Sequence, residues 1–426
     1  MNNNSRFPRR ERAFRDDSRR SSARYYEADA DRDTMPRLVV SNERVRDPRI
    51  SPRWFFDNMV VREENNPRDG AAVLLVDTRG RQVGSAIYNS HSKIRARLFS
   101  YECKQWTADY VREAVSNAVQ RRLQYFRSDD SMRLIYADAD FLPGVVADRL
   151  GNVIVIQLLT MAADMMVDVI VDELQTMLKP AGFVLQLGSP LREKEGLAVL
   201  PNRQIGEVAP KVWVQQDGFG LYADVIGGQK TGLFLDQRFN RRLLSQWASG
   251  RTVLDLFCHV GGWSMSALTQ GAAHTVGVDS SADALEMARA SAERNNYTPE
   301  QAEFIHSDAF DFLDKASDEK QYWDIIVTDP PAFAKNSHVL DSALRGYLSL
   351  NYRAMKQLSP GGLLVACSCS QAVREDVFED CLMTGARNAK MQFQIVARGG
   401  QSPDHPILLG FDESRYLKCL VLRRLE

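Results

Sequence analysis

The sequence predicts an α/β protein whose C-terminal half is a Rossmann-like domain, preceded by a small β domain and a mixed α+β domain. Three short apolar runs carry this prediction, and they end near Asp255, at Asp329 and at Cys369. Helix-like segments separate these runs, and alternating strands and helices form a parallel sheet with helices on both faces. The three run ends are therefore expected to converge at one edge of the sheet, where open α/β folds bind their ligands.

The first unit reads as a strand, a glycine turn, a helix and a second strand that ends in an acid. Its parts are Thr252–Phe257, Gly261-Gly262, Ser264–Gln270, Thr275–Val278 and Asp279. Because glycine has no Cβ, the two adjacent glycines let the backbone turn tightly and approach a ligand. This arrangement is the general design for holding a nucleoside, with the acid on the ribose hydroxyls.

Asp255 narrows the choice of ligand. A dinucleotide site would read GxGxxG, whereas the glycines here are adjacent, and a carboxylate at the strand end would repel a phosphate. The acid suits a cationic partner, such as the amino group of S-adenosylmethionine. The alternative is a Gly-Gly turn of the kind found in any doubly wound domain. A third strand, Glu303–His306, is followed by Asp308, which is placed to face an adenine amino group.

Two further strand ends add reactive groups. Trp323–Thr328 runs into Asp329-Pro330-Pro331, where two prolines fix the backbone and so present the acid at a defined angle. Phe333 follows and can stack on a flat base. The strand Gly362–Ala366 ends in Cys367-Ser368-Cys369-Ser370. The turn-rich stretch Gly227–Arg238, which includes Gln237, precedes the sheet and could lie across the cofactor.

A length of 426 residues predicts more than one domain. Residues 1–36 are rich in arginine and poor in aliphatic side chains, so we expect a disordered tail. Residues 37–105 predict the small β domain, with strands at 38–40, 72–77, 82–88 and 94–99. Residues 106–210 predict the mixed domain, with helices at 109–126 and 164–178, strands at 132–137, 144–148, 153–159 and 183–187, and a hairpin turn at 148–152. Residues 211–426 form the Rossmann-like domain.

The N-terminal part is the basic part of the chain. Lys and Arg outnumber Asp and Glu over residues 1–104, although the net charge of the whole chain is −1. This distribution suggests that an anionic polymer such as RNA docks there, and ordinary solvated charge explains it about equally well. Arg53 precedes Trp54-Phe55-Phe56, and Arg95 lies on a basic strand face, so both are candidate RNA contacts. The aromatic side chains are more often core than stacking platforms.

Composition limits the class of protein. The chain is 44% hydrophobic and 26% charged, which is typical of a soluble globular protein. Because no run approaches ~18 apolar residues, no membrane span is expected, and the N-terminus lacks a signal-peptide core. Six cysteines without ligand-like pairing argue against a metal site or a disulfide framework and indicate a reducing, cytoplasmic setting.

The chain resembles the bacterial 23S rRNA large-subunit methyltransferase I family. From about residue 37 to the end it carries the stretches GQKTGLFLDQR, DLFCHVGGW, DPPAF, SCS and DHP in the order of that family. These are cytosine-C5 enzymes with a PUA-like RNA-binding domain and S-adenosylmethionine as cofactor. The resemblance implies cofactor contacts at Asp255, Phe257, Gly261, Asp279 and Asp308. Gly262 of the glycine turn and Gln237 of the stretch before the sheet are further candidate cofactor contacts. The chain departs from the family at Ala332, where a basic residue is usual.

The resemblance also implies a mechanism. The Cys369 thiolate would add to C6 of cytosine, for which it needs a lowered pKa, and Asp329 would hydrogen-bond the N3/N4 edge. Pro330, Pro331 and Phe333 would contact the target base, and His405 is a candidate proton acceptor. Three alternatives stay open: a guanine-N7 enzyme that needs no cysteine, an exocyclic-amine methyltransferase, and a non-catalytic rRNA-binding assembly factor. The sequence also leaves open whether the chain forms a homodimer.

Overall fold

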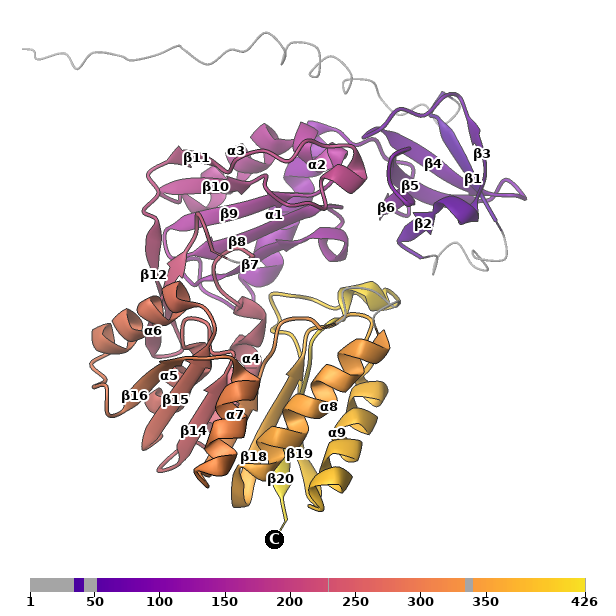
Figure 1. Cartoon of the computed structure of the whole chain (residues 1–426). Coiled ribbons are helices and arrows are strands. Elements are labelled where there is room, and N and C mark those ends of the chain that lie inside the picture. Colours follow the sequence, from indigo (N-terminus) through magenta and orange to yellow (C-terminus); the bar gives the residue numbers. More distant parts are fainter. Residues whose placement is uncertain (1–33, 42–51, 229, 334–339, 426) are drawn as a thin grey trace, which may run out of the picture.

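The computed structural model describes residues 34–41, 52–228, 230–333 and 340–425. These residues form three sheets and a two-stranded hairpin (Figure 1). The mixture of sheets and helices confirms the predicted fold class, with the Rossmann-like domain last in the chain. Most of the predicted tail, residues 1–33, lies outside the described residues.

The first sheet has six strands in the order β2-β6-β5-β4-β1-β3. Their bounds are β1 Arg37–Val40, β2 Trp54–Phe56, β3 Val60–Glu64, β4 Ala72–Asp77, β5 Gln82–Tyr88 and β6 Ile94–Ser100. One face of this sheet closes its own core around Leu38, Phe55 and Leu98. The other face shares a core with the next domain through Phe99 and Trp106, so one continuous hydrophobic core joins the two domains.

The second sheet has five strands in the order β11-β10-β9-β8-β7. Its elements are α1 Ala108–Arg122, β7 Met132–Tyr136, β8 Val145–Leu150, β9 Val153–Leu158, α2 Met161–Met165, α3 Val167–Leu178, β10 Gly182–Gln186 and β11 Arg203–Gly206. The predicted turn at 148–152 is too long, because β8 continues to Leu150 and only Gly151 and Asn152 connect the strands. Asp148 is therefore a buried strand residue, and it pairs with Arg133 over 2.7 Å.

The third sheet has seven strands in the order β16-β15-β14-β17-β18-β20-β19. Its strands are β14 Thr252–Leu256, β15 His274–Asp279, β16 Ala302–His306, β17 Trp323–Thr328, β18 Leu358–Ser368, β19 Phe393–Gly399 and β20 Lys418–Arg424. The first five in spatial order are parallel, and β20 runs antiparallel between β18 and β19. The strand order reverses between β14 and β17, and this switch point is where doubly wound sheets bind ligands.

Helices cover both faces of the third sheet (Figure 1). They are α4 Arg238–Ser245, α5 Gly262–Thr269, α6 Ala282–Arg294, α7 Ala309–Asp318, α8 Leu340–Lys356 and α9 Glu375–Ala389. Helices α4, α5 and α6, with the hairpin β12 Lys211–Gln216 and β13 Phe219–Asp224, pack on the face that Val253 enters. Helices α7, α8 and α9 pack on the face of Leu254. This alternation along β14 is the period of a strand buried on both sides.

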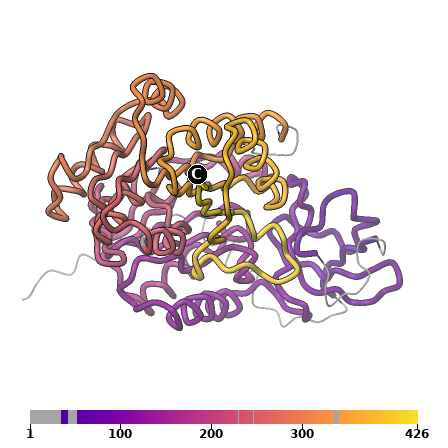
Figure 2. Tube along the Cα trace, turned by 90° about the horizontal axis from the view of Figure 1, so that it is seen from below, coloured from indigo at the N-terminus to yellow at the C-terminus, as the bar shows by residue number. Residues whose placement is uncertain are grey.

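The loop between β19 and β20, which we call the 400–417 loop, joins the third sheet to the other two. Arg122 of α1 donates to the Asp404 carbonyl over 3.0 Å, and the Arg133 amide donates to Asp404 Oδ2 over 2.9 Å. Phe411 makes an edge contact with Trp54 of the first sheet at 5.4 Å between ring centroids. Figure 2 shows this yellow loop beside the purple N-terminal tubes. Among the helices of the described ranges, none is long and apolar enough to cross a membrane.

Candidate cofactor and methyl-transfer site

Asp255, the last residue but one of β14, is a fully buried acid. Its Oδ2 accepts from the Ser264 backbone N–H over 3.0 Å and from Ser264 Oγ over 2.8 Å, which ties the strand to α5. Its Oδ1 is buried without a hydrogen-bond partner in the described part of the chain. Burial raises the pKa of Asp255 to about 7. Oδ1 can therefore accept a hydrogen bond from a ligand, and a cationic donor would form the strongest one.

The turn from Phe257 to Gly261 folds back on the sheet edge. Phe257 already has a φ of 62° and Gly261 has a φ of 80°. The strand therefore stops at Leu256, one residue earlier than expected, and α5 begins at Gly262, directly after the turn. A Cβ on Gly261 would lie 3.1 Å from the Phe304 ring, so the turn is both left-handed and crowded.

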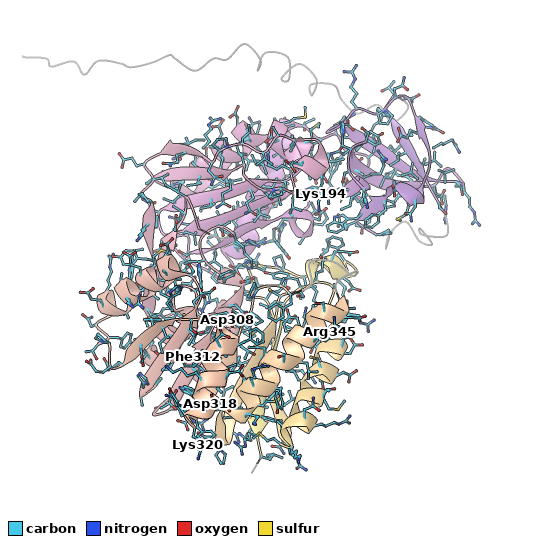
Figure 3. All side chains as sticks on the ribbon, viewed as in Figure 1. Lys194, Asp308, Phe312, Asp318, Lys320 and Arg345 are labelled. Atoms are coloured by element: carbon cyan, nitrogen blue, oxygen red, sulfur yellow. The ribbon has the colours of Figure 1, made fainter. Side chains whose placement is uncertain are left out.

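Two predicted cofactor acids hold this edge in shape. Asp279 accepts from the His259 N–H and from the Ser281 N–H, each over 2.8 Å, so it fixes the glycine turn from β15. Asp308 caps α7 by accepting from the Phe310 N–H over 2.8 Å. In Figure 3 it marks the end of α7 nearer the second sheet, and Asp318 marks the opposite end. Both acids thus lie at the carboxyl edge, as expected for ligand contacts.

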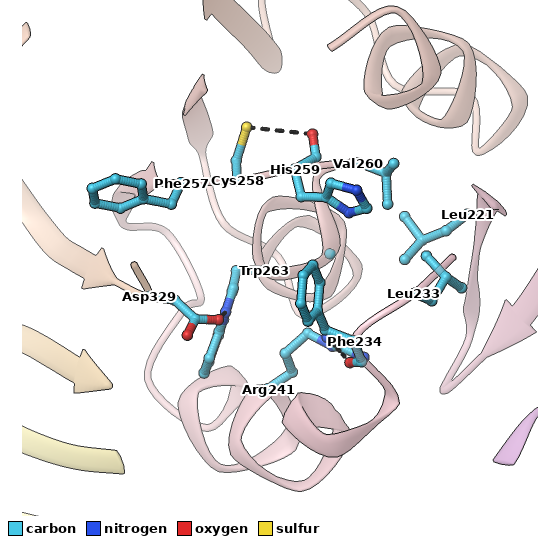
Figure 4. Close-up of a pocket in the computed structure, with 11 residues that line it drawn as sticks. Leu221, Leu233, Phe234, Arg241, Phe257, Cys258, His259, Val260, Trp263 and Asp329 are labelled. Carbon is cyan, nitrogen blue, oxygen red and sulfur yellow. Dashed lines mark hydrogen bonds between the residues drawn. The ribbon is translucent and has the colours of Figure 1, made fainter. Parts of the chain in front are cut away.

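Asp329 follows β17 and receives two N–H donors. Trp263 Nε1 donates to Oδ2 over 3.0 Å (Figure 4). Gln237 Nε2 donates to Oδ1 over 2.8 Å. Burial raises the pKa of Asp329 to about 6, against the opposing effect of the Trp263 bond. Gln237 thus binds this acid, and its predicted contact with the cofactor stays a prediction. The site is thus joined across the switch point, from α5 to the Pro-Pro turn.

A small cavity of about 30 Å³ lies at this junction. Its lining combines the glycine turn with the stretch before α4 (Figure 4). It includes Phe234, Phe257, His259, Gly262, Trp263 and Asp329. Two residues of the stretch 227–238, Leu233 and Phe234, line this cavity, and the position of the stretch across the cofactor stays a prediction.

Cys369 follows β18, and its Sγ lies 3.7 Å from the Pro330 carbonyl. Burial raises the pKa of the thiol to about 11, while Lys230 and Lys418 act in the opposite direction. The cations that a nucleophilic thiol needs are therefore present, but burial outweighs them here. Cys367 is wholly buried and faces Cys419 across the β18–β20 pair, so it is a packing residue.

Three site residues escaped the sequence reasoning: Lys230, Asp236 and Tyr416. Tyr416 Oη donates to Asp236 Oδ2 over 2.5 Å, and Lys230 Nζ lies 3.4 Å from the same oxygen. Despite burial, Lys230 and His405 hold the pKa of Asp236 well below its usual range. Asp236 stands in the GQKTGLFLDQR stretch, which was a visible signal. Its partner Tyr416 lies 180 residues away, so no local pattern could have linked them.

The predicted substrate contacts differ in exposure and packing. Pro330 is buried and Pro331 is exposed at the turn, whereas Phe333 packs against the Tyr347 ring at 4.8 Å. Phe333 therefore has a packing partner as well as a place beside the site. His405 is buried at 2% exposure and lies 3.0 Å from Asp404 Oδ1 within the 400–417 loop. Its role as a proton acceptor stays a prediction.

The two arginines expected to bind RNA also differ. Arg53 is only 3% exposed, stacks over Phe141 at 4.3 Å and donates to the Leu98 carbonyl over 3.2 Å. Its guanidinium is thus taken up in packing between the first two domains, which corrects its expected role as an RNA contact. Arg95 is half-buried and donates to the Ser90 carbonyl, which leaves part of its side chain at the surface.

Comparison with known proteins identifies the family of the chain. A family profile described as S-adenosylmethionine-dependent methyltransferase matches residues 204–423, and a PUA-like domain profile matches residues 38–101. The ribosomal RNA large subunit methyltransferase I of Klebsiella pneumoniae (strain 342) is 34% identical over 401 residues, covering 91% of this chain and 98% of that protein. The chain belongs to this methyltransferase I family. The Salmonella typhi member is 33% identical over 393 residues, covering 91% and 97% of the two chains.

Solved structures share the fold of this methyltransferase I chain. A SAM-dependent methyltransferase from Streptococcus mutans superposes with a TM-score of 0.78 at 21% identity, covering 91% of this chain and 99% of that one. A second structure, of SMU.776 complexed with SAH, gives a TM-score of 0.77 with the same coverage. The chain is thus an S-adenosylmethionine-dependent methyltransferase, and its PUA-like sheet precedes the catalytic domain as expected.

The residues present fit S-adenosylmethionine. The unpaired Asp255 Oδ1 matches the cationic amino group that this cofactor carries, and the crowded Gly261 turn brings the backbone close to the edge. Asp279 and Asp308 stand at the next two strand ends. Across the described ranges, no group of three His, Cys, Asp or Glu side chains could hold a metal ion.

Proposed function

We propose that this chain is a cytoplasmic enzyme that methylates C5 of a cytosine in 23S ribosomal RNA through a covalent adduct with Cys369. The observation that carries the proposal is the contact of Cys369 Sγ with the Pro330 carbonyl at 3.7 Å, directly beside Asp329. A thiol and an acid thus stand at adjacent strand ends, next to the cofactor edge. The curated relatives, named as large-subunit rRNA methyltransferases, support the choice of RNA.

The proposed chemistry follows from the weak nucleophilicity of cytosine C5. C5 is a weak nucleophile, and a thiolate that adds to C6 forms an S–C6 bond and moves an electron pair to C5. Asp329, whose pKa burial raises to about 6, can hold a proton and donate it toward ring N3, which makes C6 more electrophilic. When bound, S-adenosylmethionine supplies an electrophilic methyl group. Loss of the C5 proton to a base then re-forms the C5=C6 bond and releases the thiolate.

The other domains hold the RNA in this proposal. The PUA-like domain, residues 37–105, presents part of Arg95 at its surface, and the central domain, residues 106–210, sets its distance from Cys369. The target base must leave its stack to reach the thiol. The proton acceptor is proposed to be His405, from the same loop that carries Tyr416.

Nucleoside mass spectrometry tests the proposal. Purified protein is incubated with methyl-labelled cofactor and rRNA from cells lacking the enzyme, and the digest is searched for the labelled nucleoside. We expect label in 5-methylcytidine, which Cys369→Ala should abolish and the matched change of packing residue Cys367→Ala should reduce far less. Label in 7-methylguanosine, or in a base methylated on its amino group, would instead support the enzymes that need no thiol. Full activity of Cys369→Ala would contradict the covalent route.

A further inference from the structure

The Asp236 carboxylate is a buried acceptor with one oxygen unused. Asp236 is 4% exposed, and its Oδ2 accepts from Tyr416 Oη and lies 3.4 Å from Lys230 Nζ. Its Oδ1 is buried and has no partner within the described residues. A buried polar atom without a partner costs free energy, so it calls for an explanation. A ligand donor is one explanation.

The neighbours of Asp236 place its carboxylate close to the methyl-transfer site, near Asp329 and Cys369. Asp236 lies in a short 3-10 turn, Leu235–Gln237, and its neighbour Gln237 binds Asp329 Oδ1 over 2.8 Å. Asp236 is therefore linked to Asp329, the acid after β17, through the neighbouring residue Gln237.

The other side leads to the thiol. Lys418 Nζ donates to the Tyr416 carbonyl over 2.8 Å and to the Ser370 carbonyl over 2.6 Å. Tyr416 holds Asp236, and Ser370 directly follows Cys369. The Asp236 carboxylate is thus bracketed by the two strand ends that the proposed mechanism uses.

The two acids of the site differ in proton affinity. Lys230 and His405 hold the pKa of Asp236 low despite its burial, whereas burial raises the pKa of Asp329 to about 6. An ionised carboxylate only accepts hydrogen bonds, while a protonated one can also donate. Carboxyl groups pushed in opposite directions by their surroundings commonly serve opposite roles. Asp329 also has N–H donors on both oxygens, and Asp236 does not.

We propose that Asp236 selects cytosine over uracil by accepting a hydrogen bond from the 4-amino group of the target base. This inference rests on the proposed function and refines it, because it leaves ring N3 to Asp329 and gives position 4 to Asp236. Cytosine carries an N–H donor at that position, whereas uracil carries an oxygen acceptor. Uracil would bring two acceptors together and leave Oδ1 unpaired, and polar sites built for a donor reject such analogues strongly.

Lys230 occupies the outer side of this carboxylate. Its side chain is 45% exposed, compared with 5% for Asp236, and its ammonium stacks over Phe234 at 4.6 Å. A long, flexible stem lets Lys230 swing aside, so that a base can approach Oδ1 while Lys230 keeps to Oδ2. Tyr416 stays behind to orient the carboxylate.

The test compares two RNA transcripts that differ only at the mapped target, one with cytidine and one with uridine. Wild type should methylate the cytidine transcript and leave the uridine transcript unmodified. Asp236→Asn is nearly isosteric and supplies an amide N–H that can donate to the uracil oxygen. We expect it to lose at least about tenfold in 5-methylcytidine and to raise the ratio of 5-methyluridine to 5-methylcytidine by about tenfold or more.

Controls separate the proposal from loss of folding. Asp318→Asn, at the far end of α7 (Figure 3), makes the same chemical change on an exposed acid and should keep wild-type selectivity. If Asp236→Asn is inactive on both transcripts, competition between the two RNAs for binding, measured without cofactor, shows whether the variant still prefers the cytidine transcript. A lost cytidine preference supports the proposal, and a preference equal to wild type overturns it. An active variant whose product ratio is unchanged also overturns it.

The proposed function fails on a different result. If wild type itself labels a purine, the C5 reading is wrong whatever Asp236→Asn does. If wild type makes 5-methylcytidine and Asp236→Asn keeps the same selectivity, only the inference about Asp236 is wrong.

Discussion

Trp263 Nε1 donates a hydrogen bond to Asp329 Oδ2 over 3.0 Å, and this bond ties α5 to the turn after β17. The indole favours the ionised carboxylate, whereas burial favours the protonated one. The protonation of Asp329 is thus set by a competition between these two effects. The bond gives a direct way to shift that competition without touching the acid.

Trp263→Phe should raise the pKa of Asp329 further above about 6. The lost bond stabilised the charged form, so the carboxyl group then holds its proton to higher pH, by about one unit. If protonated Asp329 assists attack at C6, the alkaline limb of the pH–rate profile for 5-methylcytidine moves up by the same amount. Trp323→Phe, at the opposite end of β17, is the control. A limb that stays in place in Trp263→Phe would contradict this role of Asp329.

Cofactor affinity should increase as pH rises through about 7. Ionised Asp255 attracts the amino group of S-adenosylmethionine, and its pKa of about 7 means that much of it is protonated near neutrality. Calorimetric titration between pH 6 and 8 measures the effect. We expect Asp255→Asn to bind at least about tenfold more weakly and to flatten the pH dependence. An equally steep dependence in the variant would show that another group is responsible.

The same acid should make the ligand-free protein less stable at alkaline pH. A carboxyl group whose folded pKa is raised contributes stability at low pH, below its unfolded value, and loses it as pH rises through about 7. Asp255→Asn removes this penalty at the cost of altering the bonds to Ser264. We expect its melting temperature, measured without cofactor, to fall less between pH 5 and pH 8 than that of wild type. Parallel curves would contradict the burial of a charged Asp255.

The Cys369 thiol should become reactive only as pH increases. With a pKa of about 11, its alkylation by iodoacetamide should accelerate about tenfold per pH unit between 7 and 9. Lys418→Met removes a cation that lowers this pKa, so alkylation should slow further near pH 7, below the lowered Lys418 pKa of about 8. Peptide mass spectrometry measures it, with the half-buried Cys381 as internal reference because partial burial also raises its pKa to about 11. Faster labelling of Cys381 would signal unfolding, and unchanged labelling of Cys369 would refute the influence of Lys418.

Arg133→Met should lower the free energy of unfolding by about 3–5 kcal/mol. Arg133 binds both oxygens of the fully buried Asp148, at 2.7 and 2.8 Å, and its loss leaves that charge without its cation. Urea denaturation measures the change. Arg127→Met is the control. The side chain of Arg127 is 81% exposed and pairs with Asp129, so the loss of this pair should cost below about 1 kcal/mol. Equal losses in the two variants would contradict the distinction between buried and exposed pairs.

The parallel sheet could be predicted because each strand of the switch point is a short apolar run that ends at a turn signal. Asp255, Asp279 and Asp329 were placed by the same rule, since the carboxyl ends of parallel strands meet at one edge. The cysteine came from resemblance to the methyltransferase I family, because nothing local distinguishes Cys369 from a packing thiol.

Contacts made across the chain could not be predicted. The roles of Gln237 and Tyr416 depend on how distant segments pack against each other. The sequence pattern of neither segment indicates its distant partner. Arg53 was misread for a related reason. A basic residue beside aromatic side chains suits RNA, and it suits equally the stacked, buried guanidinium that joins two domains.

The position of β20 between β18 and β19 has a consequence for biosynthesis. As the chain leaves the ribosome, Phe393–Gly399 emerges before Lys418–Arg424, but it can join the sheet only by pairing with that later strand. Tyr416 and Lys418 arrive with the same segment, so the thiol gains its neighbouring cation, and Asp236 its phenol, at the end of synthesis. The first two sheets can fold earlier, because domains fold in the order in which they emerge. A nascent chain would thus acquire its PUA-like and central domains before it acquires a complete catalytic edge.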